Sequence, residues 1–329
     1  MPDPYKVLEV DRKASTPVIS AAYRALAIAS EGDERKLKRL NAAHSLLIDE
    51  DQRREYDQDK TNSVKRGKVI GGYRIVSEIA DGGFGTTYKA EHRETGCVVC
   101  IKHANNISAH DEELLLNEAR AVWDLRHWGI PCMRDILRMP DGSVALVMSY
   151  VEGPTLAQIL EKPQYNLGLD PEHVAWITER ILNTLKYLHL SGIVHGDIKP
   201  QNIIIQPEDH TAVLVDYGLS KVKPSRRDKA TGYTPYFAAP EQIAGGVPIP
   251  ETDFFGLGMT MIFALGGDVE FVKVPNTTGE HMIGFIKSLI KQTPLARPQW
   301  KKEDLCETIQ TVRKNDFGRS FSSMKPLNI

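Results

Sequence analysis

Two short polar stretches constrain this chain more than any other feature. Val194–Asn202 reads VHGDIKPQN, and VDYG follows at Val215–Gly218. They put Asp197 and Asn202 five residues apart, with Asp216 nineteen residues after Asp197. Phosphoryl transfer requires a group that orients the attacking hydroxyl, and oxygen ligands for magnesium. The spacing therefore predicts a site of that chemistry, with Asp197 on the hydroxyl and with Asn202 and Asp216 on the metal.

The same stretches resemble the catalytic loop and the metal-binding segment of protein kinases, written here as H-G-D-I-K-P-Q-N and D-Y-G. The resemblance implies that Lys199 lies beside the transferred phosphate and that the acceptor is serine or threonine. It also implies that Thr234, five residues before Ala239-Pro240-Glu241, bridges Asp197 and Lys199. Because Asp and Asn are also ordinary turn residues, this interpretation depends on further kinase elements that occur in order on both sides.

A glycine-rich turn is the first of these elements. Tyr73–Ile79 and Thr86–His92 are expected to be strands, and Ala80-Asp81-Gly82-Gly83-Phe84-Gly85 joins them. Glycine lets backbone N–H groups approach phosphate oxygens with no Cβ in the way. Followed by Val99-Cys100-Ile101-Lys102, the turn resembles the Gly-rich loop and the V-A-I-K strand of kinases, whose lysine holds the α- and β-phosphates.

A buried Lys102 needs a carboxylate partner to keep its charge. Glu118, on a helix predicted around Glu112–Leu125, has the spacing to supply it. The apolar run Ala145–Val151 resembles the hinge between kinase lobes, with Met148 either at the entrance to the back pocket or in the core. The residues that the resemblance assigns to ATP binding are Ala80, Gly82, Gly83, Gly85, Thr87, Cys100, Lys102, Met148, Ser149, Val151 and Ile204.

Three residues of this nucleotide site depart from the family pattern. Ala80 replaces the first glycine, Thr87 replaces the valine that covers the adenine, and Cys100 replaces the neighbouring alanine. Thr87 and Cys100 could weaken the affinity for ATP, whereas no charged group that the chemistry needs is missing. The alternative to an active kinase is therefore a pseudokinase scaffold that binds nucleotide without transfer.

Beyond the hinge, a helix predicted at Pro171–Leu190 leads into the catalytic loop. Gly196 stands where many kinases have the arginine that pairs with a phosphorylated activation segment, so the resemblance favours a kinase that needs no such phosphate. It also implies an ion pair between Glu241 and Arg297, and a brace from Asp253 to the backbone of the catalytic loop.

The chain departs from the family after Leu265. Gly266–Glu280 carries few helical signals, and His281–Lys291 resumes a helical pattern. The helix that shapes the protein-substrate platform is therefore expected to be short or missing, which leaves the substrate open. A last helix is predicted over residues 303–315.

The first 58 residues predict a separate helical module. A short helix at Asp3–Val10 and amphipathic helices at Pro17–Ala29 and Glu34–Leu47 can bury a small core. DPYKVLEV, AAYRALA and LNAAHSLLIDEDQRREYD resemble the J domain of DnaJ-type co-chaperones. Ser30-Glu31-Gly32-Asp33 stands where that family has the His-Pro-Asp tripeptide that stimulates the chaperone ATPase. We expect a degenerate J-like module kept for docking, or a cap that only stabilises.

Two further features could indicate zinc binding or nucleic-acid binding: a pair of cysteines and a basic linker. Cys97 and Cys100 form a C-x-x-C pair, but zinc needs two further ligands, and residues three apart on a strand face opposite sides. Buried free thiols are therefore expected. The polar stretch before the first strand contains Lys65, Arg66 and Lys68, which could suggest a nucleic-acid contact. Because short basic runs are usually solvated, we interpret this stretch as a linker.

Together these features predict an α+β chain with a bilobal protein-kinase-like fold, whose N-lobe is β-rich and whose C-lobe is helical, preceded by a small all-α J-like domain. The predicted function is an ATP- and Mg²⁺-dependent Ser/Thr protein kinase that acts on a protein substrate, with an unidentified docking partner for the J-like domain. The alternative is a pseudokinase scaffold or a chaperone-linked adaptor. The expected parts are a J-like domain at 1–58, a linker at 59–70, a kinase domain at 71–315 with lobes at 71–152 and 153–315, and a flexible tail at 316–329.

Charge and hydropathy exclude other partner classes. The chain has 41 basic and 43 acidic residues, so its balance favours neither nucleic acid nor an anionic surface. No apolar run approaches the ~20 residues that span a bilayer. The N-terminus lacks the pattern of a signal peptide, and four cysteines fit a reducing compartment. A cytoplasmic protein is expected, and its oligomeric state is left open.

Overall fold

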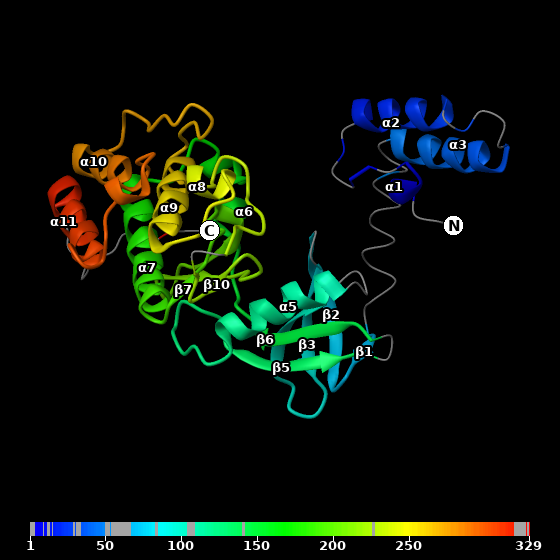
Figure 1. The fold of residues 1–329 in the computed structure, drawn as a ribbon, viewed down its shortest axis with the longest axis horizontal. Helices are drawn as coiled ribbons and strands as arrows, with labels where there is room; N and C mark the ends of the chain where they lie inside the picture. Colours follow the sequence, from blue (N-terminus) through cyan, green and yellow to red (C-terminus); the bar gives the residue numbers. More distant parts are fainter. Residues whose placement is uncertain are drawn as a thin grey trace. The chain divides into compact units, whose positions relative to one another are not determined.

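The computed structural model describes residues 4–8, 10–11, 14, 16–28, 30, 34–49, 53, 67–82, 85–103, 109–139, 142–225, 228–318, 327 and 329. Contacts divide the chain into two units (Figure 1). One comprises Met1–Val69 with Arg74–Glu78, and the other comprises Ile70–Tyr73 with Ile79–Ile329.

The N-terminal module contains, among its described residues, the helices α1 (Pro4–Val7), α2 (Thr16–Ile28) and α3 (Glu34–Ile48). The two long helices match the predicted spans to within a residue, whereas α1 is shorter than expected, because the Val10 N–H bonds to the Tyr5 carbonyl and closes the helix. The Tyr23 ring stacks on His44 with ring centroids 4.1 Å apart. The small core that the amphipathic pattern predicts consists of Tyr5, Leu8, Ile19, Leu40, Ala43 and Leu47.

A six-stranded sheet with the order β1-β2-β3-β4-β6-β5 builds the smaller lobe. Helix α5 (Ala109–Val122) packs against β5 and β6 of this sheet and begins three residues before the predicted helix (Figure 1). The strands are β1 (Val69–Ile70), β2 (Tyr73–Gly82), β3 (Gly85–His92), β4 (Val98–His103), β5 (Met133–Arg138) and β6 (Val144–Ser149).

The strands on either side of the glycine-rich stretch are longer than the sequence predicts. Strand β2 continues through Ala80 to Gly82, and β3 begins at Gly85 instead of Thr86. Residues expected in a loop therefore belong to the two strands, because glycine and alanine can extend a strand that already pairs with its neighbour. Gly83 and Phe84 lie outside the described residues.

The larger lobe is mainly helical, as predicted. Its central helix α7 (Pro171–Leu190) has the predicted bounds, because Asp170 caps it through the Glu172 N–H and Pro171 occupies its first position. The other helices are α6 (Leu156–Leu160), α8 (Pro240–Ile243), α9 (Pro250–Ala264), α10 (Glu280–Leu289) and α11 (Leu305–Phe317), with 3₁₀ turns η1 (Pro163–Tyr165), η2 (Pro200–Asn202) and η3 (Pro294–Ala296).

Two short two-stranded sheets flank the polar loop of the larger lobe. One pairs β7 (Ile193–Val194) with β10 (Lys221–Val222), and the other pairs β8 (Ile203–Gln206) with β9 (Thr211–Leu214). Residues 195–202 therefore lie between β7 and β8, both of which are anchored. This arrangement fixes the two ends of the polar loop.

No helix occurs between Leu265 and Gly279, a stretch that the structure describes in full, and an isolated bridge joins Asp268 to Lys273 instead. This confirms the expected loss of the platform helix.

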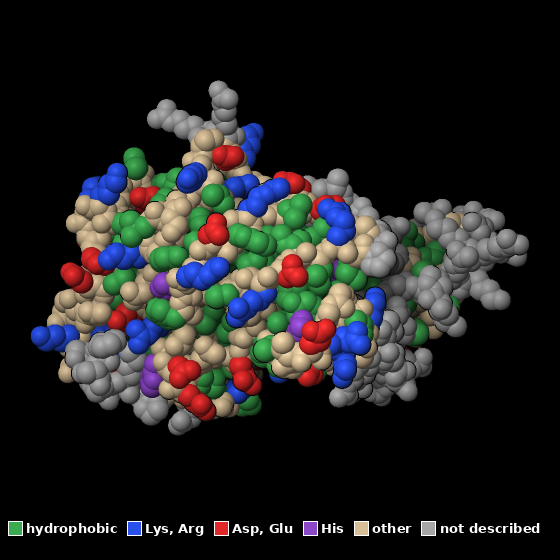
Figure 2. Space-filling model, turned by 90° about the horizontal axis from the view of Figure 1, so that it is seen from below, with side chains coloured by type: hydrophobic (Ala, Val, Ile, Leu, Met, Phe, Trp, Pro, Cys, Tyr) green, Lys and Arg blue, Asp and Glu red, His purple; other side chains and the backbone are tan. Residues whose placement is uncertain are grey.

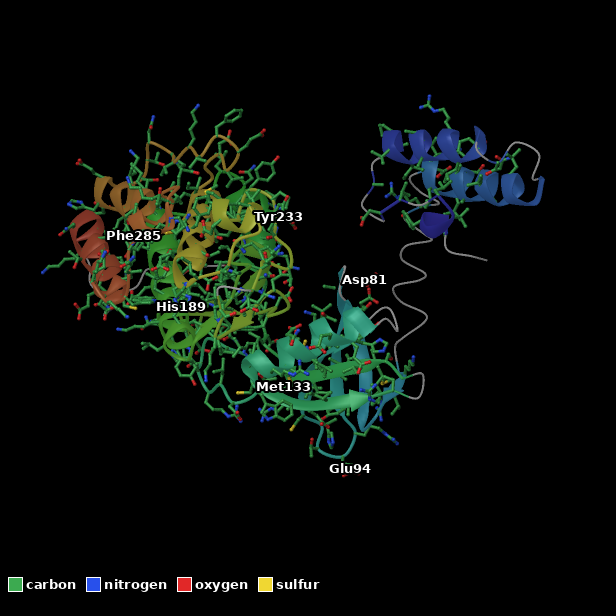
Figure 3. All side chains as sticks on the ribbon, in the orientation of Figure 1. Asp81, Glu94, Met133, His189, Tyr233 and Phe285 are labelled. Atoms are coloured by element: carbon green, nitrogen blue, oxygen red, sulfur yellow. The ribbon has the colours of Figure 1, made fainter. Side chains whose placement is uncertain are left out.

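Figure 3 places His189 and Phe285 within the larger lobe, and Phe285 is 5% exposed.

The end of the chain differs from the flexible tail that the sequence predicts. Helix α11 runs to Phe317, two residues past the predicted end. Leu327 is 4% exposed and belongs to the core of the larger lobe, and Ile329 packs against it. These apolar side chains hold their part of the tail on the core, whereas residues 319–326 and 328 lie outside the described part of the chain.

Charged side chains of both signs are interspersed over one face of the molecule, as the near balance of acidic and basic residues leads us to expect (Figure 2). Within the described ranges, no helix has the length and apolarity that crossing a bilayer would require.

Candidate functional site

A cavity of about 440 Å³ lies between the sheet of the smaller lobe and the polar loop of the larger one. Most residues that the sequence assigns to the site line it. Gly82 is not among its described lining residues, and Gly83 is not described. The predicted residues that line the cavity are Ala80, Gly85, Thr87, Cys100, Lys102, Glu118, Met148, Ser149, Val151, Asp197, Lys199, Asn202, Ile204 and Asp216.

Sequence reasoning missed several lining residues, among them Ile79, Thr155, Gln201 and Leu219. Ile79 is apolar and adjoins Ala80 at the end of a predicted strand, which was a usable signal. Thr155 and Gln201 carry none, because a neutral polar side chain next to a turn is common on any surface.

Lys102 lies at the centre of the cavity's charge arrangement. Its Nζ lies 2.6 Å from Glu118 Oε2 and 2.7 Å from Asp216 Oδ1. Strand β4 and helix α5 carry the first pair, and Asp216 comes from the VDYG segment. Burial alone would lower the pKa of Lys102, but the Glu118 and Asp216 carboxylates raise it above its ordinary value. The lysine is therefore a permanent cation.

The pKa values of the two carboxylates beside this cation are shifted in opposite directions. Burial raises the pKa of Glu118 above its ordinary value, and Lys102 only partly reverses that shift. Burial acts on Asp216 in the same sense, but Lys102 outweighs it and lowers the pKa of Asp216 to about 2. The Asp216 side chain is 39% exposed, and that exposed part faces the cavity. An ionised oxygen therefore faces the space where a ligand would lie.

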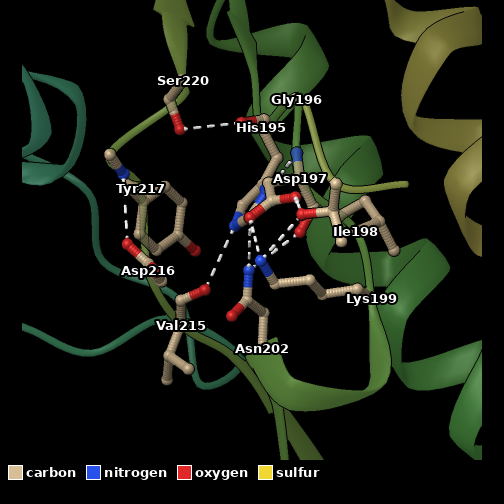
Figure 4. A network of polar contacts seen from close by, with 12 residues as sticks. His195, Gly196, Asp197, Ile198, Lys199, Asn202, Val215, Asp216, Tyr217 and Ser220 are labelled. Atoms are coloured by element: carbon tan, nitrogen blue, oxygen red, sulfur yellow. Dashed lines mark hydrogen bonds and ion pairs between the residues drawn. The ribbon is translucent and has the colours of Figure 1, made fainter. Parts of the chain in front are cut away.

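Asp197 lies in the polar loop, and Figure 4 shows Lys199 and Asn202 beside it. Thr234 Oγ1 donates to Asp197 Oδ1 at 2.7 Å, and Lys199 Nζ lies 2.7 Å from Oδ2. The amide nitrogen of Asn202 donates to the Asp197 carbonyl at 2.9 Å and to Oδ2 at 3.1 Å. Lys199 also donates to Thr234 Oγ1 at 2.9 Å. The structure thus brings together the residues that the sequence selects, from positions up to 37 residues apart.

Residues 73–316 match the protein kinase domain, and residues 3–57 match the DnaJ domain. The chain belongs to the protein kinase family.

Several curated relatives of the kinase domain are named serine/threonine-protein kinases. Serine/threonine-protein kinase D of Synechocystis sp. is 31% identical over 217 residues, which cover 60% of this chain and 41% of that protein. PrkC of Bacillus subtilis is 30% identical over 237 residues, 70% of this chain and 35% of that kinase. Human myosin light chain kinase 3 is 31% identical over 210 residues, 62% of this chain and 25% of that kinase. The chain thus spans less than half the length of these relatives.

Asp253 of helix α9 holds the start of the kinase's catalytic loop. It is 1% exposed, and its two oxygens accept from the His195 and Gly196 N–H groups at 2.8 and 2.7 Å. His189 Nε2 lies 2.8 Å from Asp253 Oδ2. Burial lowers the pKa of His195, so its imidazole stays neutral against the Tyr217 ring. His195 is therefore a packing and hydrogen-bonding residue of the loop.

The activation segment of the kinase is tied to the catalytic loop through uncharged groups. Gln242 Nε2 donates to the Gly196 carbonyl at 2.8 Å, and Ser220 Oγ donates to the His195 carbonyl at 3.2 Å. Gly196 has a φ of +78°, and a Cβ there would lie 3.0 Å from the Leu219 carbonyl oxygen. The backbone at Gly196 therefore suits glycine better than any other residue.

The donor set fits magnesium. Asn202 uses its amide nitrogen on Asp197, which leaves its Oδ1 for a cation, and Asp216 uses only Oδ1 on Lys102. Mg²⁺ prefers such hard oxygens and completes its shell with water and phosphate.

The four cysteines are free, but not all are buried as the sequence predicts. Cys97 is exposed because it lies in the turn before β4 and not in the strand. Cys100 and Cys132 are partly exposed, and Cys306 is buried. Burial raises the pKa of Cys100 to about 12, so the thiol that lines the cavity stays protonated.

Proposed function

We propose that this chain is an ATP- and Mg²⁺-dependent kinase that phosphorylates serine or threonine on a protein substrate. One observation carries the proposal. The Lys102–Glu118 pair, the Lys102–Asp216 pair and the Thr234–Asp197–Lys199 arrangement are all formed in the same structure. A chain that only binds nucleotide has no need of Thr234 and Lys199 around the group that orients an attacking hydroxyl.

The reaction forms a bond between the substrate oxygen and the γ-phosphorus and breaks the bond from that phosphorus to the leaving oxygen of ADP. When bound, ATP supplies the phosphoryl group and Mg²⁺ neutralises its negative charge. Asp197 orients the attacking hydroxyl and accepts its proton. Lys199 donates to the transferred phosphate. Thr234 fixes the relative positions of Asp197 and Lys199 by its hydrogen bonds to both.

Lys102 binds the α- and β-phosphates, and Glu118 holds its ammonium in place. Asn202 and Asp216 would hold the metal through the oxygens that they leave unused. The adenine would lie between the sheet and the hinge strand β6. The residues proposed around the nucleotide are Ala80, Gly82, Gly83, Gly85, Thr87, Cys100, Met148, Ser149, Val151 and Ile204.

We also propose that the activation segment needs no phosphate. The bonds from Gln242 and Ser220 to the catalytic loop supply the connection that an arginine and a phosphate make in other kinases. Replacing Ser225 and Thr231 by alanine and Tyr233 by phenylalanine in one variant should leave transfer intact. Loss of transfer in that variant would overturn this activation mechanism. Figure 3 shows Tyr233 at the surface, and it is 50% exposed, so its substitution should not disturb the core.

The DnaJ match supports a J-like domain over residues 1–58. We propose that a linker at 59–70 joins it to a kinase domain at 71–315, with lobes at 71–152 and 153–315, and that a tail follows at 316–329. Ser30-Glu31-Gly32-Asp33 stands in place of His-Pro-Asp, so we propose that this domain docks a partner and does not stimulate a chaperone ATPase. An added Hsp70-type ATPase should hydrolyse ATP at the same rate with and without the chain, after correction for the chain's own hydrolysis.

The deciding experiment is phosphate transfer from γ-labelled ATP with Mg²⁺, to the chain itself and to a generic protein acceptor. Label in the wild type that is lost in both Asp197→Asn and Asp216→Asn would support the kinase. Labelled serine or threonine would support the acceptor assignment. ATP binding without label in the wild type would favour the alternative, a pseudokinase scaffold or chaperone-linked adaptor, for which Thr87 and Cys100 are the sequence evidence.

A further inference from the structure

A series of hydrogen bonds connects the turn after η3 to the start of the catalytic loop. The Trp300 indole donates from Nε1 to His189 Nδ1 at 2.8 Å. His189 Nε2 lies 2.8 Å from Asp253 Oδ2, and the same oxygen accepts from the His195 N–H at 2.8 Å. The side chains of Trp300, His189 and Asp253, here called the indole network, therefore reach the loop that carries Asp197 (Figure 4).

The indole network is buried and held in place by its neighbours. The side chains of His189 and Asp253 are 2% and 0% exposed. The ring of Phe254 packs edge-on against His189 and against Trp300, with ring centroids 5.5 and 5.3 Å apart. The Lys302 N–H bonds to a backbone carbonyl at 2.8 Å and closes the turn that carries Trp300. The indole N–H is thus aimed at the imidazole by a fixed backbone and a packed ring.

The indole N–H determines which nitrogen of His189 carries the proton. An indole nitrogen only donates, so His189 Nδ1 must be the acceptor. An imidazole that accepts at Nδ1 carries its hydrogen on Nε2, and Nε2 is the nitrogen that faces Asp253. The opposite tautomer would point two N–H groups at each other and a lone pair at the carboxylate. Trp300 therefore makes His189 a hydrogen-bond donor to Asp253.

This donor matters because Asp253 holds the catalytic loop. Its carboxylate accepts from the His195 and Gly196 N–H groups, and His189 supplies the third donor. If the imidazole turns or changes tautomer, Oδ2 loses one of its two donors and the carboxylate is free to rotate. Asp197 directly follows Gly196, so its position changes with the loop, and small displacements of a catalytic group lower rates strongly.

From this geometry we propose that Trp300 is a positioning residue of the catalytic loop, acting on Asp197 through the hydrogen bonds of His189 and Asp253. The inference rests on the proposed kinase function. It differs from a packing role, because the effect belongs to one N–H group and not to the aromatic ring. Nucleotide binding should not depend on this N–H, since none of the three side chains is among the described residues that line the cavity.

Two pairs of variants separate the hydrogen bond from the packing. Trp300→Phe keeps an aromatic ring and removes the N–H. Its matched control is Trp176→Phe, because the buried Trp176 indole also donates to an imidazole, His173 Nδ1 at 3.4 Å, but lies in α7 outside the indole network. His189→Gln keeps an acceptor for Trp300 and a donor for Asp253 on one amide, whereas His189→Phe removes both.

Two kinds of measurement are made on the full chain, under conditions in which urea unfolding shows each variant to be folded. Transfer from γ-labelled ATP to a generic protein acceptor gives kcat and the KM for ATP. Amide hydrogen exchange of His195 and Gly196, resolved by NMR and expressed relative to the amides of α7, reports on the catalytic loop without any activity. A general loss of stability speeds exchange in both places, whereas release of the loop speeds it at these two amides alone.

We expect Trp300→Phe to lower kcat about three- to tenfold, as the loss of one hydrogen bond implies, with the KM for ATP unchanged. Relative exchange of the His195 and Gly196 amides should rise by a similar factor. Trp176→Phe should change neither quantity, even where it lowers the free energy of unfolding as much. His189→Gln should stay within about threefold of the wild type in kcat, and His189→Phe should lose at least as much as Trp300→Phe.

Wild-type amide exchange in Trp300→Phe would overturn the inference. So would equal changes in Trp300→Phe and Trp176→Phe, or equal changes in the two His189 variants. Because amide exchange needs no turnover, it decides the inference even if the wild type transfers no phosphate. Absent transfer in the wild type, with the expected exchange pattern, would count against the proposed kinase function alone.

Discussion

Thr234 and Asp197 lie 37 residues apart in the chain, and the threonine hydroxyl donates to Asp197 Oδ1 at 2.7 Å. The same hydroxyl oxygen accepts from Lys199 Nζ at 2.9 Å. One hydroxyl thus connects the activation segment to both charged side chains of the catalytic loop. Its donor and acceptor capacities are both used, so a replacement must supply both.

Thr234→Ala and Thr234→Val should lower kcat about 10- to 100-fold, because each removes a hydrogen bond to charged groups that is worth about 1.5–3 kcal/mol. Thr234→Ser keeps the hydroxyl and should stay within about threefold of the wild type. Steady-state kinetics would measure both effects. ATP affinity should be unchanged in all three variants, since Thr234 is not among the described residues that line the cavity. Equal activity of the alanine and serine variants would contradict this role.

Asp253→Ala should destabilise the larger lobe. The substitution leaves the His195 and Gly196 N–H groups without their buried acceptor, at a cost of about 1–3 kcal/mol each. Urea unfolding should report a loss of about 2–5 kcal/mol, and transfer should fall as well. Asp209→Ala, at an exposed carboxylate in the turn between β8 and β9, is the control and should change stability by less than about 0.5 kcal/mol. A stable Asp253→Ala variant would show that solvent replaces the carboxylate.

Arg297 uses all five of its N–H groups although its side chain is 0% exposed. Two donate to the Glu241 carboxylate at 2.6 and 2.9 Å, and the others reach the carbonyls of Lys291, Glu251 and Gln292. Arg297→Ala should cost about 3–5 kcal/mol, because it leaves a largely buried carboxylate unpaired. Arg297→Lys should recover little, since an ammonium has three donors and no planar fork.

The matched control for Arg297 is Arg138→Ala. Arg138 pairs with Glu112 at 2.6 Å, but its side chain is 63% exposed, so its removal should cost less than about 1 kcal/mol. Urea unfolding of the variants gives the comparison. Similar losses at Arg138 and Arg297 would mean that burial does not determine the strength of these pairs.

Much of the fold could be predicted because its signals are local. Helix α7 has the predicted bounds because a proline, a capping aspartate and an apolar stripe all occur within its own sequence. Strand β5 was missed, because Met133–Arg138 contains three charged residues and acquires its strand structure from pairing with β6. The position of Cys97 outside β4 likewise depends on where the neighbouring strand stops pairing.

Predicting the candidate site depended on a different kind of information. Lys102, Glu118, Asp197 and Asp216 could be selected because charge and spacing mark them. Gln242 could not be selected, since nothing local indicates that its amide reaches the Gly196 carbonyl across 46 residues. Such uncharged long-range contacts follow from the packing of α8 against the loop, and only a structure shows them.

Cys100 should react with iodoacetamide only at high pH. The thiolate is the nucleophile, and burial raises the pKa of Cys100 to about 12, so only about one thiol in ten thousand is ionised at pH 8. The alkylation rate should therefore rise about tenfold per pH unit from pH 7 up to the limit of native structure, without the plateau near pH 9 of an ordinary thiol. Mass spectrometry of a Cys97→Ser variant isolates the reaction of Cys100 from that of the exposed Cys97. In denaturant the plateau near pH 9 should return. A native plateau below pH 10 would show that the thiol contacts water in the cavity far more than its burial implies.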